Sequence, residues 1–367
     1  MTTGDFSPSA TMATEAAGNS GFWQELRAEL LADRAIYFLG AAYCLGAVAL
    51  AAALPGEQHA HLLIYGGLWL RLGIPAVFLF LVLTNLPGIV RERSDRPLAT
   101  LAGRIAGYAT PRAAAGLGLI VLQVMLMGAF TSVKTMLPEI SGFAWDMALA
   151  DLDAVLHGGV DPWLLIAALV SRPWALHAVE FVYASGWMVM IGLVPAVVAL
   201  SPKLAPIRVR FFVTYILCWI LLGNLLAVAT MSAGPAYFGE VTGDFERFRP
   251  LLDQVAANAG RLWSAFDIQG MLWQAYESDA AALGSGISAF PSLHVAMATL
   301  WAIVAFERSW KLGIAALVFL AFILVGSVAL GWHYAIDGYV SIPLTMLIWK
   351  IVGWLPSNTA PPSSRGA

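Results

Sequence analysis

Charged residues are scarce in this chain. Asp, Glu, Lys and Arg make up 12% of its 367 residues, and hydrophobic residues make up 59%. Soluble domains carry about 25% charged residues, so this chain has too few charged groups to coat the surface of a soluble protein of 39.2 kDa. The composition therefore excludes a soluble globular protein and indicates a polytopic membrane protein.

Other scarcities exclude further classes. The 20 cationic and 23 acidic residues give a net charge of −3, so there is no basic excess to suggest nucleic acid as a partner. The only cysteines, Cys44 and Cys218, lie in apolar runs and are interpreted as small core residues, not as a disulfide or a metal site. The first twenty residues lack the positive region of a signal peptide.

Eight apolar stretches are long enough to cross a bilayer as helices, which takes about 20 residues. They lie near 34–54, 62–84, 112–133, 175–200, 207–231, 291–306, 312–330 and 336–354. The sixth is short, so its end is the least certain. A further stretch, 162–170, is too short to span and is interpreted as re-entrant or interfacial. The fold class is therefore an all-α integral membrane protein with about eight transmembrane helices.

The spans suggest a division of the chain. Residues 1–33 are predicted to be a disordered cytoplasmic tail, and 34–84 to form two accessory transmembrane helices. Residues 112–355 form the predicted six-helix membrane domain, and the Pro- and Ser-rich end, 356–367, a second disordered tail.

The placement of Lys and Arg predicts the orientation. The segment between the second and third spans is rich in arginine: Arg91, Arg93, Arg96, Arg104 and Arg112. That side is predicted to be cytoplasmic, and alternation of the spans then puts both termini inside. Five cations remain on the outer side: Lys134, Arg172, Arg247, Arg249 and Arg261.

Two long segments, about 134–174 and 232–290, also lie on the outer side. Loops of this length are uncommon unless they are functional or disordered. Both contain aromatic and apolar residues, which favours packed caps over the helices.

A first motif opens the sixth span, in the run from Phe290 to His294. Pro291 suits the first turn of a helix, where its missing N–H costs nothing. Ser292 and His294 are therefore expected in the first turn. The free N–H groups and positive dipole end there suit an anion such as phosphate.

A second motif opens the eighth span. His333 and Asp337 are four residues apart, so on a helix they share a face. A carboxylate that accepts the Nδ1 proton fixes the imidazole tautomer and leaves Nε2 free as a nucleophile. Ionisable groups at membrane depth are costly and usually functional.

Two other interpretations stay open on chemistry alone. A His-x-x-x-Asp pair is also common as polar glue between membrane helices. Two histidines and an aspartate are also the start of a metal site, although no further ligand-rich cluster and no His-Glu-x-x-His accompany them. We predict no metal and no cofactor, and expect the imidazoles of His294 and His333 within about 4–7 Å, the space of one phosphate with its hydrogen bonds.

Together the two motifs resemble those of the type-2 phosphatidic acid phosphatase superfamily. Phe-Pro-Ser-Leu-His followed by His-Tyr-x-x-Asp is most similar to its inositol phosphorylceramide synthase (inositol phosphotransferase) branch. The resemblance covers roughly 115–355 and extends to softer upstream matches, including Asp161-Pro162-Trp163 and the run from Ser232 to Tyr237. It implies a six-helix catalytic core.

The resemblance also implies roles for single residues. His333 would be the nucleophile that attacks phosphorus, and Asp337 its orienting carboxylate. His294 would protonate the leaving oxygen and then activate the acceptor. Ser292 and the helix-start amides would bind phosphate oxygens, and Tyr237 joins the candidate substrate-binding residues.

The sequence departs from the superfamily pattern in its cations. The Lys-x6-Arg-Pro motif is absent, and the Ser-Arg pair expected before the second histidine is Gly326-Ser327 here. Phosphoryl transfer needs positive charge on the phosphate oxygens, so it must come from the outer cations. Arg247 and Arg249 are the preferred pair, and Lys134 is a further candidate; the alternative is that they meet lipid headgroups.

The sequence thus predicts a membrane enzyme that transfers a phosphate-linked headgroup between lipids at the extracytoplasmic face, with membrane lipids as its partners. A lipid phosphate phosphatase with the same site is the first alternative. A non-catalytic transporter or scaffold is the second, but it predicts polar groups at mid-membrane, whereas these motifs cluster at one face.

Overall fold

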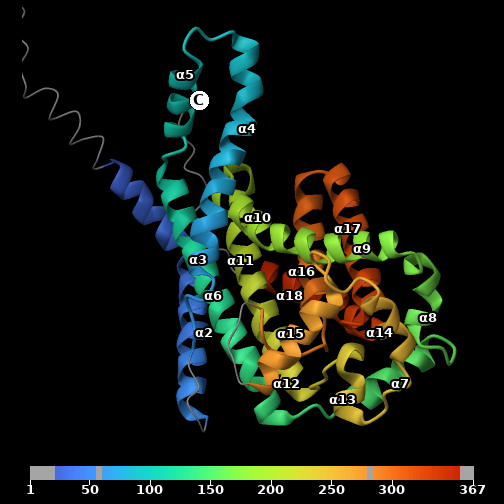
Figure 1. Ribbon diagram of the computed structural model, residues 1–367. Helices are drawn as coiled ribbons and strands as arrows, with labels where there is room; N and C mark the ends of the chain where they lie inside the picture. The colour runs from blue at the N-terminus through green and yellow to red at the C-terminus, as the bar shows by residue number, and fades with distance from the viewer. Residues whose placement is uncertain (1–20, 55–59, 279–283, 356–367) are drawn as a thin grey trace, which may run out of the picture.

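The computed structural model describes residues 21–54, 60–278 and 284–355. Within these ranges all regular secondary structure is helical, as predicted (Figure 1). The tail predicted over 356–367 and the first twenty residues lie outside the described residues.

Seven helices of 20 to 31 residues are long and apolar enough to cross a membrane. The single helices among them are α2 (Arg34–Ala53), α6 (Pro111–Ser141), α17 (Trp310–Ala329) and α18 (Ala335–Trp354). The others are composite: α3 (Gly66–Leu68) with α4 (Ile74–Glu92), α9 (Pro173–Phe181) with α10 (Trp187–Leu200), and α11 (Arg208–Leu217) with α12 (Ala227–Ala229). A π-helical turn joins the two parts of each composite helix. The chain is therefore an all-α integral membrane protein.

The sixth predicted span is α16 (Leu293–Arg308), which has 16 residues. It is shorter than the about 20 residues that a span needs, and it is not among the seven. It packs against α17 and α18, and its residues from Val295 to Ala302 are buried. This helix is therefore the centre of the bundle, and few of its side chains could face lipid.

The two long segments that were predicted to be caps do fold into short helices. The first holds α7 (Asp146–Leu156) and α8 (Pro162–Ile166), and the second holds α13 (Phe238–Thr242), α14 (Arg249–Ala256) and α15 (Ala265–Glu277). They gather at one end of the bundle (Figure 1). Side-chain amides join them to the helix ends: Gln254 donates to the Val170 carbonyl at 2.6 Å and Gln269 to the Leu330 carbonyl at 2.7 Å.

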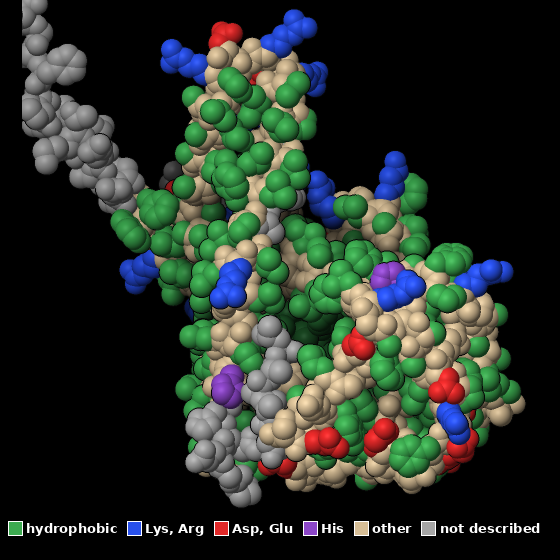
Figure 2. Space-filling model, viewed as in Figure 1, with side chains coloured by type: hydrophobic (Ala, Val, Ile, Leu, Met, Phe, Trp, Pro, Cys, Tyr) green, Lys and Arg blue, Asp and Glu red, His purple; other side chains and the backbone are tan. Residues whose placement is uncertain are grey.

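The opposite end carries the basic hairpin. The helix α5 (Pro97–Ala106) runs back along α4 after a turn that contains Arg93 and Arg96. Figure 2 shows Lys and Arg side chains at the tip of this hairpin, whereas Asp and Glu side chains are more numerous around the cap helices. The two ends of the molecule thus differ in charge, and the assignment of the basic end to the cytoplasmic side stays a prediction.

The prediction of a disordered tail over residues 1–33 is wrong for its last part, because residues 21–32 form a helix. Asp33 follows this helix and is fully buried. It accepts a hydrogen bond from Arg208 Nε at 3.0 Å, and Glu29 also contacts Arg208. Burial raises the pKa of the Asp33 carboxyl to about 6. This buried ion cluster attaches the helix over residues 21–32 to α11.

Polar contacts join the two predicted accessory helices to the rest. Tyr43 on α2 donates to Asn224 Oδ1 at 2.7 Å, and Tyr65 bonds Thr131 on α6 at 2.9 Å. In addition α2 packs along α6 and α11. The division into accessory helices and a catalytic domain stays a prediction.

The buried ion cluster gives a stability prediction. Arg208→Met should lower the free energy of unfolding by about 3–5 kcal/mol, because it leaves the buried Asp33 without its cation. Thermal unfolding of the protein in detergent measures the change. Arg34→Met is the matched control, because Arg34 is exposed. Equal unfolding temperatures for the two variants would contradict the structural role of the cluster.

Candidate active site

His333 lies in the short turn between α17 and α18. Gly331 opens the turn with a φ of +73°, which glycine adopts without strain. The N–H groups of Trp332 and His333 both donate to the Ser327 carbonyl, at 3.0 and 3.2 Å. Ser327 stands where the superfamily pattern has a Ser-Arg pair, and here its backbone anchors the histidine to the end of α17.

Asp337 bonds His333 by reaching back over the start of α18. His333 Nδ1 lies 3.0 Å from Asp337 Oδ2, and the Tyr334 N–H donates to the same oxygen at 3.2 Å. Asp337 is fully buried and His333 is 7% exposed. The sequence predicts two side chains on one helical face, whereas His333 precedes the N-cap Tyr334 and Asp337 is the third helical residue. The carboxylate fixes Nδ1 as the protonated nitrogen, which leaves Nε2 with its lone pair.

Ser292 caps α16, the helix that carries His294. The helix begins at Leu293, so Pro291 lies before the cap and not in the first turn as predicted. Ser292 Oγ accepts the Val295 N–H at 3.4 Å. The first N–H groups of a helix have no partner within the helix, so those of Leu293 and His294 can bind an anion.

His294 faces His333 across a gap. The ring centroids are 6.1 Å apart at an angle of 61°, which falls within the predicted range. Two aromatic rings pack on His294: Tyr183 stacks on it at 4.8 Å and Trp187 lies at 4.3 Å. Sequence reasoning missed both rings, because aromatic residues four apart in an apolar span look like core residues.

Each of the two rings also carries a polar hydrogen. The buried Tyr183 hydroxyl and Trp187 Nε1 have no hydrogen-bond partner within the described ranges. Tyr183 also interacts electrostatically with Asp337. Buried donors without a partner are rare and call for an explanation, and a bound oxyanion would provide one.

Lys134 supplies positive charge near the histidines. It lies half-buried on α6, and Gly286 packs directly on its side chain. Its ammonium group interacts electrostatically with the His294 imidazole. It forms no hydrogen bond or ion pair with any described residue, so its charge is available to a ligand.

The preferred cations of the sequence prediction are engaged elsewhere. Arg247 binds Asp161 through two hydrogen bonds of 2.9 and 3.1 Å and Asp151 at 2.6 Å. These bonds hold its pKa above the usual value. Arg249 is 61% exposed and pairs with Glu246 at 3.0 Å. The structure does not bring these two arginines into contact with the histidines, and Arg247 instead ties the two cap segments together.

The run from Ser232 to Tyr237 lies where the superfamily pattern has its first cationic motif, and here it supports the His333 turn. Gly234 has a φ of +91°, and a Cβ there would lie 2.8 Å from the Trp332 carbonyl oxygen. The Ala236 N–H donates to the Gly331 carbonyl at 2.8 Å. Tyr237 is buried, donates to the Gln269 carbonyl at 3.0 Å and stacks on Trp273. Its hydroxyl is thus used within the protein.

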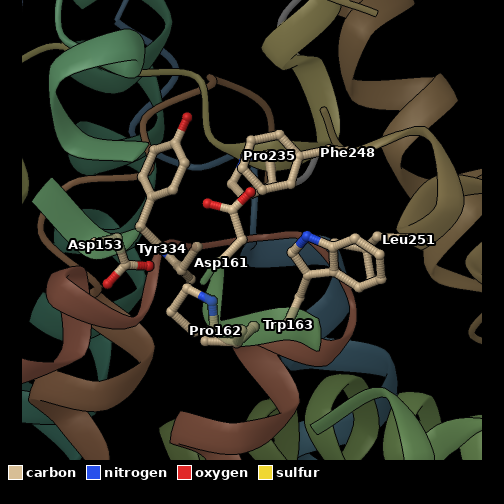
Figure 3. A pocket seen from close by; sticks show the side chains of 10 residues that line it. Asp153, Asp161, Pro162, Trp163, Pro235, Phe248, Leu251 and Tyr334 are labelled. Atoms are coloured by element: carbon tan, nitrogen blue, oxygen red, sulfur yellow. The ribbon is translucent and has the colours of Figure 1, made fainter. Parts of the chain in front are cut away.

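His333 also lines a small pocket on the cap side. Figure 3 shows the side chains of Asp153, Asp161, Trp163 and Tyr334 around this pocket. Two carboxylates therefore lie close to the His333 turn. Among the described residues no group of three or more His, Cys, Asp or Glu side chains could hold a metal ion.

The family model of the PAP2 superfamily matches residues 147–351. The chain belongs to the PAP2 superfamily. The match runs from α7 to α18 and includes His294, His333 and Asp337, which confirms the resemblance to the superfamily. No curated protein and no solved structure matches the chain. Membership supports a lipid enzyme of the phosphatase or phosphotransferase type.

Lys134 and Arg247 can be told apart by experiment. Lys134→Met should weaken inhibition by orthovanadate, a phosphate mimic, by about tenfold or more, because one hydrogen bond to a charged group is lost. Its unfolding temperature should be near that of the wild type. Arg247→Met should instead lower the unfolding temperature, since it leaves Asp161 unpaired. The reverse pattern would mean that Arg247 binds the phosphate.

Proposed function

We propose that the protein is a membrane lipid phosphotransferase that moves a phosphate-linked headgroup between lipids through a phosphohistidine intermediate. The observation that carries the proposal is the pair of imidazoles 6.1 Å apart, one of which is held by a buried carboxylate at 3.0 Å. This spacing accommodates one phosphate group between a nucleophile and an acid.

In the first step His333 Nε2 attacks the phosphorus of the donor lipid. The P–N bond forms while the bond to the donor's alkoxide oxygen breaks, and His294 gives its proton to that oxygen. The imidazole ring of His333 becomes positively charged, and Asp337 stabilises that charge. The product is a phosphohistidine that carries the headgroup.

In the second step an acceptor hydroxyl gives its proton to His294, and its oxygen attacks phosphorus. The P–N bond breaks and the electron pair returns to His333 Nε2. If the acceptor is a lipid alcohol, the reaction is a transfer. If it is water, the same residues perform hydrolysis.

In both steps the phosphate oxygens need hydrogen-bond donors and positive charge, because stabilisation of their negative charge dominates phosphoryl transfer. We assign this role to Lys134, with the hydroxyl of Tyr183, the indole N–H of Trp187 and the first N–H groups of α16. These groups would replace the cations of the superfamily motif that this chain lacks. Ser292 would take part by capping α16, and Arg249 and Tyr237 would not contact the phosphate.

Transfer is preferred to hydrolysis because Phe-Pro-Ser-Leu-His and His-Tyr-x-x-Asp are most similar to the inositol phosphotransferase branch. The alternative is a lipid phosphate phosphatase that acts on phosphatidic acid or polyprenyl phosphate. The distribution of cations supports a site on the extracytoplasmic side of a plasma or inner membrane. A non-catalytic transporter gives no reason for a histidine held by a buried carboxylate opposite a second histidine.

The two histidines should have separable roles. His333→Ala should abolish turnover of a fluorescent phospholipid, because the nucleophile is lost. His294→Ala should slow turnover, because it removes the acid of the first step and the base of the second. Wild-type protein that is quenched during turnover should carry a label when the donor headgroup phosphate carries ³²P, and His333→Ala should carry none. The label should be stable in base and released by acid, as expected of a phosphoramidate. Normal turnover by His333→Ala would exclude the mechanism.

The class of acceptor can be identified with lipids from cells. Mass spectrometry should reveal a new phosphoinositol or phosphoglycerol lipid on overexpression, and its loss on deletion. A change in lipid phosphates alone would identify a phosphatase instead. EDTA should leave the rate unchanged in both cases, because His333 provides the nucleophile; strong inhibition would revive a metal mechanism.

A further inference from the structure

A carboxylate from the first cap segment, that of Asp153, caps the start of α18, the helix that follows His333. Asp153 lies on α7, 182 residues before Ala335, the first residue of α18. Its Oδ2 accepts the Ala335 N–H at 2.8 Å and its Oδ1 accepts the Ile336 N–H at 3.0 Å. Asp153 is 2% exposed. Both oxygens thus bind the first two free N–H groups of α18.

A helix start with free N–H groups is a natural anion site. In this protein two helices, α16 and α18, begin close to the histidines, so a phosphate could in principle bind at either. Asp153 already occupies the site on α18, whereas the cap of α16 is the neutral Ser292. The internal carboxylate therefore directs a phosphate toward α16, where His294 lies.

The carboxylate of Asp153 also favours the positive charge that forms on the His333 imidazole. His333 precedes α18, so the positive end of the helix dipole opposes a positive charge on its imidazole. Attack on phosphorus creates such a charge. Asp153 offsets the dipole at this end, because it places a negative charge on the first N–H groups of α18.

A second carboxylate on α7, that of Asp146, holds the side chain of Tyr334 in the same turn. Asp146 Oδ1 accepts the Tyr334 hydroxyl at 2.8 Å and the Gly234 N–H at 2.8 Å. Its Oδ2 accepts the Ala233 N–H at 2.8 Å. Asp146 and Asp153 are seven residues apart, two helical turns, so both project from one face of α7 toward the His333 turn.

We propose that Asp153 is a positioning residue for the His333–Asp337 pair, an internal anion that occupies the start of α18 and keeps the substrate phosphate at the start of α16. This inference rests on the proposed function, since it assigns Asp153 a part in the same reaction. Asp153 acts through the start of α18, and does not touch the substrate.

Chemical rescue tests the role of the carboxylate. Asp153→Gly should lower kcat about tenfold to a hundredfold, the factor that corresponds to one or two hydrogen bonds to a charged group. KM should change little, because the headgroup contacts remain. Formate, a free carboxylate, should then restore kcat in a saturable manner. Asp153 lines the small pocket beside His333, which gives formate a route to the vacated position.

Asp151→Gly is the matched control for glycine in α7. The Asp151 side chain is 63% exposed and bonds Arg247, not α18. Its kcat should not respond to formate. Asp153→Asn is the second variant, in case Asp153→Gly does not fold: its amide oxygen can accept only part of the bonds, so kcat should fall while the unfolding temperature stays close to that of the wild type.

The results separate the two proposals. No turnover of any phospholipid or lipid phosphate by the wild type would defeat the proposed function. Turnover by the wild type with a normal kcat for folded Asp153→Gly or Asp153→Asn would overturn the role of Asp153 alone. A loss of kcat in folded Asp153→Gly that formate does not restore would also overturn it, because the effect would then come from the helix and not from the anion.

Discussion

The hydrogen bond between His333 Nδ1 and Asp337 is the interaction on which the rest of the site depends. It requires a carboxylate that is fully buried, and burial of a charge is costly unless hydrogen bonds compensate for it. The N–H of Tyr334 provides one such bond, and the start of α18 provides a favourable dipole. The turn before α18 must therefore hold one shape. Its neighbours serve that end: Ser327 binds it from α17, and Gly234 and Ala236 pack on it from the cap.

The cap segments thus do more than close the end of the bundle. On α7, Asp153 binds the first N–H groups of the helix that follows the His333 turn, and Asp146 binds N–H groups of the run from Ser232 to Tyr237 that packs on the turn. Arg247 ties α7 to the second cap segment. The acidic side chains Asp146, Asp151, Asp153 and Asp161 are structural anions in this part of the protein, each bound to backbone N–H groups or to Arg247. This arrangement leaves Lys134 as the cation near His294 that has no partner among the described residues. The hydroxyl of Tyr183 and the indole N–H of Trp187 would then be further donors to a bound phosphate.

The class of fold could be predicted from local patterns in the sequence, whereas the pairing of the two motifs rested on their resemblance to the superfamily. Apolar runs predict spans, and His-x-x-x-Asp at a helix start predicts a held imidazole. The choice of cation could not be predicted. Arg247, Arg249 and Lys134 all lie on the same predicted side, and only their contacts separate them: Arg247 meets two carboxylates that are distant in sequence. Tyr183 and Trp187 were missed for a related reason, since an aromatic residue in an apolar span carries no sign of what its ring faces.

The length of α16 has a consequence for the depth of the reaction. A helix of 16 residues is about 24 Å long, about 6 Å less than the hydrocarbon core of a bilayer. If Arg308 lies at one membrane surface, Ser292 lies below the other, so a phosphate between the histidines sits deeper than the headgroup phosphates of that leaflet. In the proposed reaction a lipid would have to sink, or the bilayer to thin, before its phosphate could reach the histidines. The rate of that reaction would then depend on the thickness of the bilayer.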